Sequence, residues 1–471
     1  MDIDFGRQSR KGLDALVANV SNVNCYVEEQ GPDGKGPLPV YADPGLTRWD
    51  SVGASGPARG HQENGDVALY SVLGNEIYKM TPSGAGAKIG GLIGSGKVYM
   101  AINQAADPEI AIVTNDNQYF IVSTSTDTVA INTDNDLPAV NSVDFLDGYF
   151  VFSTAYGEIW HTQPNDAGNI NALSFATAES DPDGLVRLKG HKGFLFALGQ
   201  RSLEIWRDVG TTPFAFSPED ADIDIGCAAG HSVTEVSDGL AWVDHFRNVR
   251  LLKGGAPQII STHSVARKLE DLTDDEIADV EGWRYWHEGH EFYELKSAQW
   301  SQIYDVTTGL WHDGMSQGLN RRSRQRHVLF NNLDILGNET DGKLYYIDRT
   351  SYHDAGSNFV MSAISRPYHA FPNKLTCSAF ELDMITGVGL DSATADTANP
   401  QVMFDVSRNG GKTWGAQRTR PLGKIGEYSQ KIRFNNLGKA DEKGFVFRVS
   451  ASSAVVRGII RADAQFEELE S

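Results

Sequence analysis

The chain has 471 residues, of which 40% are hydrophobic and 10% are aromatic, and this is enough to bury a sizeable core in one to three domains. Its 62 Asp and Glu residues outnumber 41 Lys and Arg residues, and the net charge of −21 excludes a protein that binds nucleic acid by neutralising phosphates. The 48 glycines show no collagen-like period and instead fit a strand-rich protein with many tight turns.

Residues 1–60 are predicted to form an N-terminal arm with short strands. The first five residues, 1–5, are acidic and lack the apolar core of a signal peptide. No apolar run in the chain approaches the roughly 18 residues that a membrane-spanning helix needs. Three widely separated cysteines, Cys25, Cys227 and Cys377, form neither a disulfide framework nor a zinc-ligand spacing. We therefore expect a soluble protein that is made in a reducing compartment and is not secreted by the classical route.

From about residue 66 to 365, one pattern recurs at intervals of roughly 40–50 residues. An alternating apolar strand is followed by a turn containing Gly, Asn or Asp, and then by a second strand rich in aromatic residues. Residues 68–72 with 76–80, and 148–153 with 158–160, are two examples. This period is typical of β-propeller blades, whereas a β-sandwich or a simple β-meander is the alternative.

The predicted fold is therefore all-β. We expect residues 61–365 to form a β-propeller of about six blades. Residues 366–471 are expected to form a C-terminal β-sandwich-like domain, so that the N- and C-terminal segments together build an additional β-rich domain. The large aromatic residues of the repeats are predicted to be buried between blades: Tyr149, Phe152, Trp160, Phe196, Trp206 and Trp242.

One short helix is predicted inside the repeats. Thr273 and Glu276 have the spacing of a capping box, in which each side chain bonds the backbone amide of the other residue. Shortly afterwards, His287 and His290 suggest a metal site. Two histidines three positions apart on one strand would point to opposite faces, so a polar hairpin turn is favoured over a zinc site.

The densest basic run of this acidic chain follows, with Arg321, Arg322, Arg324 and Arg326 in a stretch of six residues. One interpretation is a contact with nucleic acid or with an acidic partner surface. The other is a solvated loop between blades. We expect exposed side chains, whose joint replacement by serine impairs assembly or DNA retention and leaves the thermal midpoint almost unchanged. Normal packaging, retention and ejection of DNA would instead favour the solvated loop.

Near the C-terminus, residues 407–414 read S-x-N-x-G-x-T-W, which is close to the Asp-box turn of many β-propellers. We expect a structural turn in which the side chain of Asn409 bonds backbone amides, the two glycines allow positive φ, and the tryptophan packs beneath. The residues assigned to this turn are Ser407, Asn409, Gly410, Gly411 and Trp414.

A turn of this kind is compatible with an enzymatic role, because Asp-box propellers include sialidases. The chain has one such turn, with Asn409 at the usual acidic position, and no recognisable arrangement of the three arginines that sialidases need. We predict no catalytic residue, no metal site and no cofactor, and hence no enzyme. A glycan-binding or glycan-hydrolysing, sialidase-like propeller remains the alternative function.

Seven short segments, taken in their order along the chain, make this sequence resemble one viral family. It resembles the tail nozzle proteins of short-tailed bacteriophages, which are also called packaged-DNA stabilisation or tail accessory proteins. Asn409 departs from the family's acidic turn residue, and the arginine run has no counterpart that we recognise. The segments are Ser21–Glu28, Pro39–Leu46, Gly56–Gly60, Ile225–Ala229, Leu240–Val243, Gln258–Thr262 and Ser407–Trp414.

The resemblance implies a structural protein of the virion tail that is assembled in the host cytoplasm. It implies a homo-hexameric ring below the portal and its adaptor protein, with a tail needle, plug or fibres attached distally. The axial channel would retain packaged double-stranded DNA and conduct it during ejection without sequence-specific binding. An acidic wall suits such a channel because like charges repel. Arg321, Arg322, Arg324 and Arg326 are then candidate contacts to a partner or to DNA.

Overall fold

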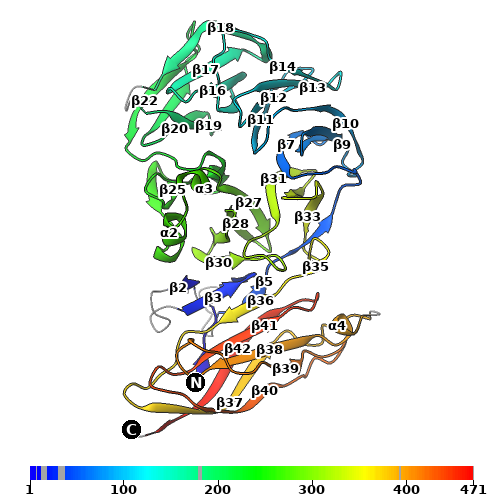
Figure 1. Cartoon of the computed structure of the whole chain (residues 1–471), viewed down its shortest axis with the longest axis vertical. Coiled ribbons are helices and arrows are strands. Elements are labelled where there is room, and N and C mark those ends of the chain that lie inside the picture. The colour runs from blue at the N-terminus through cyan, green and yellow to red at the C-terminus, as the bar shows by residue number, and fades with distance from the viewer. Residues whose placement is uncertain (7, 12–18, 30–37, 179–182, 392–393, 470–471) are drawn as a thin grey trace.

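The computed structural model describes residues 1–471 except 7, 12–18, 30–37, 179–182, 392–393 and 470–471. It consists of a β-propeller and a β-sandwich that lies beside the rim of the ring (Figure 1). The predicted all-β fold class, with a second β-rich domain built from both terminal segments, is confirmed. None of the helices in the described ranges is long and apolar enough to cross a membrane.

Within the described residues the propeller has seven blades of four antiparallel strands, one more than the approximate number expected. The first strands of the blades are β7 (Ala58–Asn64), β11 (Val98–Ile102), β15 (Ser142–Leu146), β19 (Leu185–His191), β23 (Thr234–Val236), β27 (Glu281–His287) and β31 (Arg324–Phe330). The second strands are β8 (Ala68–Leu73), β12 (Glu109–Thr114), β16 (Tyr149–Ser153), β20 (Phe194–Gly199), β24 (Gly239–Val243), β28 (His290–Lys296) and β32 (Leu333–Asn338).

The outer half of each blade completes the sheet. The third strands are β9 (Glu76–Met80), β13 (Tyr119–Ser123), β17 (Glu158–Gln163), β21 (Leu203–Asp208), β25 (Val249–Lys253), β29 (Ser301–Asp305) and β33 (Leu344–Asp348). The fourth strands are β10 (Gly86–Gly91), β14 (Thr128–Ile131), β18 (Asp166–Thr177), β22 (Phe216–Ile223), β26 (Ala256–Ile259), β30 (Leu310–Gly314) and, in the last blade, β6 (Gly45–Arg48).

Strand β6 closes the ring from the N-terminal side of the sequence. It pairs antiparallel with β33, with Leu46 opposite Ile347, and the hydroxyl of Thr47 donates a hydrogen bond to Asp348 Oδ2 at 2.8 Å. The seventh blade is thus made from two segments that lie far apart in the sequence. The repeat pattern alone does not show this pairing, because β6 lies upstream of all the repeats.

Apolar side chains fill every interface between neighbouring blades. Seven buried clusters lie one at each interface, including the interface between the last blade and the first. Period-2 alternation places these side chains on both faces of each sheet, and sheet-on-sheet packing then removes them from water. Of the aromatic residues predicted to lie between blades, Tyr149 is half-buried. The others are buried: Phe152, Trp160, Phe196, Trp206 and Trp242.

Two short helices, α2 (His263–Glu270) and α3 (Asp274–Ala278), lie between the fifth and sixth blades, after a 3₁₀ turn at Gly230–Ser232. The predicted capping box at the start of α3 is confirmed. The Thr273 hydroxyl accepts from the Glu276 backbone amide at 3.3 Å, and the Glu276 carboxylate accepts from the Thr273 amide at 2.8 Å.

The sandwich consists of two sheets that enclose a separate apolar core, in which the rings of Phe380 and Phe404 lie 4.6 Å apart. The first sheet contains β1 (Asp2–Ile3), β4 (Cys25–Val27), β5 (Val40–Ala42), β37 (Lys374–Met384), β40 (Ile432–Lys439) and β42 (Gly458–Leu469). The second contains β2 (Arg10–Lys11), β3 (Asn19–Val23), β36 (Met361–Ile364), β38 (Gln401–Ser407), β39 (Arg418–Pro421) and β41 (Val446–Ala451). A small hairpin, β34 (His353–Asp354) with β35 (Ser357–Asn358), precedes β36, and α4 (Ala395–Ala398) precedes β38.

The propeller and the sandwich share one sheet. Strand β30 of the sixth blade runs parallel to β3, with Val23 opposite Asp313, and β3 in turn pairs with β36. The result is a ten-stranded sheet that extends from β27 in the propeller to β39 in the sandwich. Backbone hydrogen bonds therefore link the two domains directly.

Candidate functional site

Two of the four arginines in the run, Arg322 and Arg324, lie inside the protein. Arg322 is 1% exposed, and its guanidinium lies 2.7 Å from Asp43 Oδ2 and 3.9 Å from Asp354 Oδ2. Arg324 is equally buried, and its Nε donates to Glu294 Oε2 at 3.0 Å. The expectation of exposed side chains is wrong at both positions, because buried carboxylates from distant segments pair with them. Because both guanidinium groups are buried in ion pairs, we now expect their replacement by serine to lower the thermal midpoint.

The other two arginines are only partly buried. Arg321 forms a two-point ion pair with the carboxylate of Glu339, at 2.9 and 3.1 Å. Arg326 occupies a β-bulge with φ of 51° and pairs with Glu281 Oε2 at 2.7 Å. Such a bulge redirects a side chain, and here it directs Arg326 to the propeller axis. Contact of these two residues with a partner or with DNA stays a prediction.

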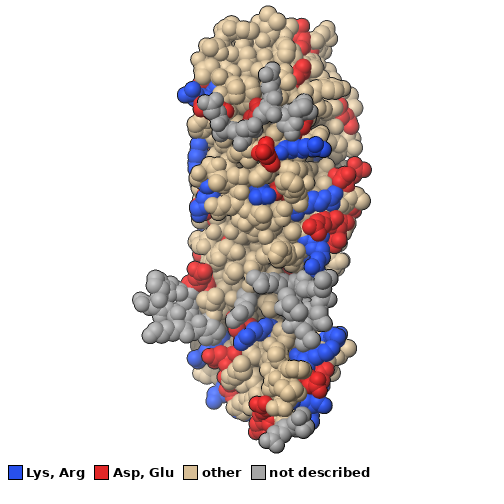
Figure 2. All heavy atoms as spheres, turned by 90° about the vertical axis from the view of Figure 1, so that its left-hand side faces the viewer, with Lys and Arg blue, Asp and Glu red and all other residues tan. Residues whose placement is uncertain are grey.

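The face shown in Figure 2 displays no dense basic patch among its described residues. On the face shown in Figure 2, Lys and Arg side chains lie among Asp and Glu side chains rather than in an area of one sign.

Buried charges also connect the propeller with the sandwich. Asp43 accepts from Arg322 and lies 3.1 Å from His312 Nε2. Burial alone would raise the pKa of Asp43, but His312 and the nearby arginines hold this pKa well below its usual value. On the sandwich side, the guanidinium of Arg457 lies 4.5 Å from the ring centroid of Phe359, which Arg322 approaches to 5.2 Å. Buried charged side chains thus lie on both sides of Phe359 at the junction between the domains.

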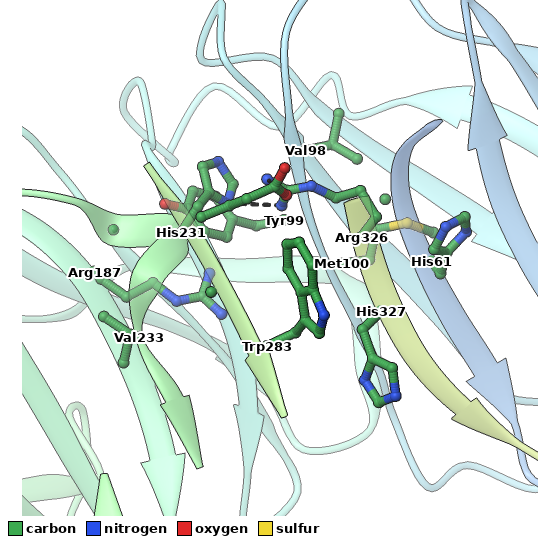
Figure 3. A pocket seen from close by; sticks show the side chains of 14 residues that line it. His61, Val98, Tyr99, Met100, Arg187, His231, Val233, Trp283, Arg326 and His327 are labelled. Carbon is green, nitrogen blue, oxygen red and sulfur yellow. Dashed lines mark hydrogen bonds and ion pairs between the residues drawn. The ribbon is translucent and has the colours of Figure 1, made fainter. Parts of the chain in front are cut away.

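A small polar cavity of about 160 Å³ lies at the propeller axis (Figure 3). Six blades contribute to its lining, chiefly through their innermost strands, and β27 and β31 supply its charged pair. Figure 3 shows long side chains from different blades converging on the same space. The lining side chains that carry the argument below are His61, Tyr99, Arg187, His231, Trp283 and Arg326.

Burial and nearby positive charges lower the pKa values of two histidines in this cavity, His61 and His231. Burial, followed by the charges of Arg326 and His327, lowers the pKa of His61 to about 3. Burial and the positive charges of Arg326, Lys97 and Arg187 lower the pKa of His231 well below its usual value. Positive charges close to both imidazoles thus add to the effect of burial.

A stack of side chains forms one wall of the cavity. The ring of Tyr99 lies parallel to that of His231, with centroids 4.0 Å apart, and the guanidinium of Arg187 lies 4.0 Å from the Tyr99 centroid. Burial raises the pKa of Tyr99 to about 12, so its hydroxyl stays protonated at neutral pH. A second cavity of about 260 Å³ adjoins this wall and shares Tyr99 and His231 with the first.

Sequence reasoning did not find this cavity, apart from Arg326 and its neighbours. Its residues are spread from 60 to 327, so no local motif contains them. Their common signal is their position on the innermost strands, and an alignment of the repeats with one another would have revealed it.

The two histidines of the sixth blade lie on the same side of a hairpin. His287 and His290 are opposite each other across the turn between β27 and β28. The centroids of their rings lie 5.8 and 5.0 Å, respectively, from the centroid of the Tyr26 ring. The polar hairpin turn that was favoured over a zinc site is confirmed, because residues 288–289 form a turn between the two histidines. The supporting argument, that both histidines lie on one strand and point to opposite faces, is wrong. His290 instead bonds Asp305 Oδ2 at 2.7 Å. Among the described residues no group of three or more His, Cys, Asp or Glu is placed to hold a metal ion.

The turn at 407–414 lies in the sandwich, between β38 and β39. The Ser407 hydroxyl accepts from the Gly411 amide at 2.9 Å, and Asn409 Oδ1 accepts from the Thr413 amide at 2.9 Å. Gly411 and the glycine before it have φ of 92° and 66°. Trp414 is half-buried, with an arginine guanidinium 4.5 Å from its ring. The polar groups of the turn are thus used within the turn.

Comparison with known proteins gives two family matches that together span most of the chain. Residues 6–352 match the family described as bacteriophage P22 Gp10, β-propeller, and residues 368–467 match the family described as bacteriophage P22 Gp10, β-sandwich. The tail hub protein gp10 of Salmonella phage P22 is 24% identical over 286 residues, which cover 56% of this chain and 58% of that protein. The aligned part is thus little more than half of either protein.

Solved structures give weaker likenesses. The computationally designed Ika8 protein covers 73% of this chain and 98% of its own, with 11% identity and a TM-score of 0.39. The match to a catalytically inactive virginiamycin B lyase from Staphylococcus aureus, crystallised with quinupristin, covers 64% of this chain and 98% of the lyase. The identity is 13% and the TM-score is 0.46. Likenesses at this level carry no argument about this chain.

Proposed function

This chain belongs to the bacteriophage P22 Gp10 family, and from that premise we propose that it is a structural protein of a phage tail, without a catalytic role. The observation that supports this most strongly is that the propeller and sandwich models match in order and cover both domains. In the tail, six copies form a ring below the portal and its adaptor. The ring retains packaged DNA, conducts it during ejection and carries the distal needle, plug or fibres.

The DNA path in this proposal runs between copies of the chain and not through the propeller axis. The axial cavity of about 160 Å³ has room for only about five water molecules. The major groove of a DNA duplex is by itself about 12 Å wide, so a duplex cannot enter. A lumen must therefore form from the outer surfaces of several copies, and an excess of negative charge on those surfaces would keep DNA from adhering.

The same negative charge opposes assembly of the free protein. Each chain carries −21, so a ring brings like charges together unless local pairing or a partner offsets the repulsion. We expect the purified chain to be monomeric or weakly associated, and to form a ring on the adaptor or at raised salt, where screening is stronger. Assembly would take place in the host cytoplasm.

Light scattering on the chain alone, at raised salt and with the adaptor protein tests this proposal. A sixfold mass that appears on the adaptor, and a ring below it in images of the assembled particle, are the expected results. A single copy per adaptor complex would contradict the ring. Release of sugar from host polysaccharide would instead support the glycan-hydrolysing alternative, which no contact in the described residues favours.

A further inference from the structure

The axial cavity contains polar nitrogen atoms that have no partner. His61 Nε2, Arg187 Nε, Trp283 Nε1 and Arg326 Nε are all buried without a hydrogen bond within the described part of the chain. All four belong to residues that line the same cavity. Trp283 is only 4% exposed, and its Nε1 atom is itself buried. Buried polar groups are nearly always satisfied, and this cluster therefore requires an explanation.

The chemistry of these atoms specifies the missing group. The nitrogens of arginine and the indole N–H of tryptophan donate hydrogen bonds and cannot accept them. What is missing is consequently a group rich in acceptors. The neutral imidazole of His61 can supply a further donor, because its Nδ1 lies 2.9 Å from the Ser71 hydroxyl, which can donate to it.

The charge balance points to an anion. Arg326 is paired with Glu281, and Lys97 near the mouth is paired with Asp279 at 2.6 Å. Arg187 forms no ion pair with any residue that the structure describes, and its one backbone contact, to Val143 O, is 3.5 Å long. A carboxylate that acts on Arg187 is that of Asp144, which is itself in contact with Lys189 at 3.1 Å. The guanidinium of Arg187 thus lies at the cavity with no carboxylate of the described residues in direct contact, although the chain as a whole is strongly acidic.

We propose that the axial cavity binds a small oxyanion of the phosphate type, taken up from solution. Arg187 supplies a positive charge that has no direct ion pair within the described residues, Trp283 donates through Nε1, and Arg326 donates through Nε while it keeps its pair with Glu281. A volume of about 160 Å³ accommodates such an ion together with water. The adjoining cavity, which shares the Tyr99 and His231 wall, provides a polar route to the site. The proposal does not depend on the tail function.

Calorimetric titration of the full chain with sodium phosphate, at constant ionic strength, tests the site. The wild type is expected to bind one phosphate saturably, whereas chloride at the same ionic strength gives no saturable heat. Trp283→Phe keeps an aromatic ring, although one smaller than the indole, and removes the N–H donor, whereas Arg187→Gln removes the charge. Each variant should bind phosphate about 10- to 100-fold more weakly, the range for a hydrogen bond to a charged group.

Arg461→Gln is the matched control, because it removes an exposed positive charge in the sandwich, 3.0 Å from Asp383. Its phosphate affinity should equal that of the wild type. The proposal is overturned if the wild type shows no saturable binding up to about 10 mM phosphate. It is also overturned if the control loses as much affinity as the cavity variants. Trp283→Phe and the wild-type titration decide the matter if Arg187→Gln does not fold.

A nucleoside monophosphate distinguishes a free ion from a phosphate carried on a larger molecule. If the cavity takes a free oxyanion, the nucleotide binds more weakly than inorganic phosphate or does not bind. Tighter binding of the nucleotide would contradict the free ion as the ligand.

Discussion

Replacing Arg324 by methionine should be among the most destabilising single changes in the propeller. The substitution keeps an unbranched side chain but removes the charge that faces Glu294, which is completely buried. Breaking a buried ion pair from one side typically costs about 3–5 kcal/mol, because the remaining charge has lost its solvation and its partner. Tyr285 also loses a contact, since Arg324 Nη2 lies 3.3 Å from its hydroxyl.

The reverse single change, Glu294→Met, should cost a similar amount. The double variant with methionine at both positions should lose much less unfolding free energy than the two single variants lose in sum. Two apolar side chains can replace a buried ion pair at little net cost. Urea unfolding of the four proteins, together with amide hydrogen exchange in β28 and β31, measures these differences where they arise.

Arg207→Met provides the comparison, because Arg207 pairs with Glu219 at 2.8 Å while both side chains remain substantially exposed. Exposed pairs contribute about 0–1 kcal/mol. If Arg324→Met costs no more than Arg207→Met, or if the double variant is as unstable as the sum of the singles, the reasoning about the buried pair is refuted.

Three further changes test other parts of the structure. Trp206→Ala, at a residue 4% exposed, should cost about 3–5 kcal/mol in urea unfolding, whereas Trp286→Ala, at a residue 43% exposed, should cost far less; equal losses would contradict the core assignment. Gly411→Val should destabilise the sandwich by about 1–3 kcal/mol because φ is 92°, while Asn409→Asp is tolerated; a harmless valine would refute the strained turn. Burial lowers the pKa of His287 to about 4, below the value of about 6.5 in the unfolded chain. The unfolded state therefore binds the proton first, and this residue should lower stability by up to about 1.4 kcal/mol per pH unit as the pH falls from 6.5 towards 4. In the His287→Phe variant, the thermal midpoint should depend less steeply on pH over that range. An unchanged dependence of the midpoint on pH would count against the assignment.

Local patterns in the sequence predicted the parts of this protein that are built from local contacts. The alternating hairpins predicted the blades, and the spacing of Thr273 and Glu276 predicted a helix start, because strands and caps are decided within a few residues. The seven short segments, taken in their order along the chain, predicted the family, and this prediction is confirmed.

The parts that were missed depend on residues far apart in the sequence. The run of four arginines was predicted to be solvated, because the sequence does not show that Arg322 pairs with Asp43 and Arg324 with Glu294 in the folded protein. The seventh blade needed a partner strand from outside the repeats. The hairpin turn at His287 and His290 was predicted, but the pairing of the two histidines across it was not. In each case, the deciding contact has no signature near the residues concerned.

Closure of the ring by β6 has a consequence for how the protein is made. Thr47 and Asp348 are 301 positions apart, so β6 emerges from the ribosome long before its partner β33 exists. At about 5–20 residues per second, the early strand waits roughly 15–60 s with an unpaired edge. Strand β42, which pairs with β37 and β5, appears later still. A translation product that stops before these strands would thus be left with an open ring and half a sandwich, and its exposed strand edges would mark it for chaperones or proteolysis.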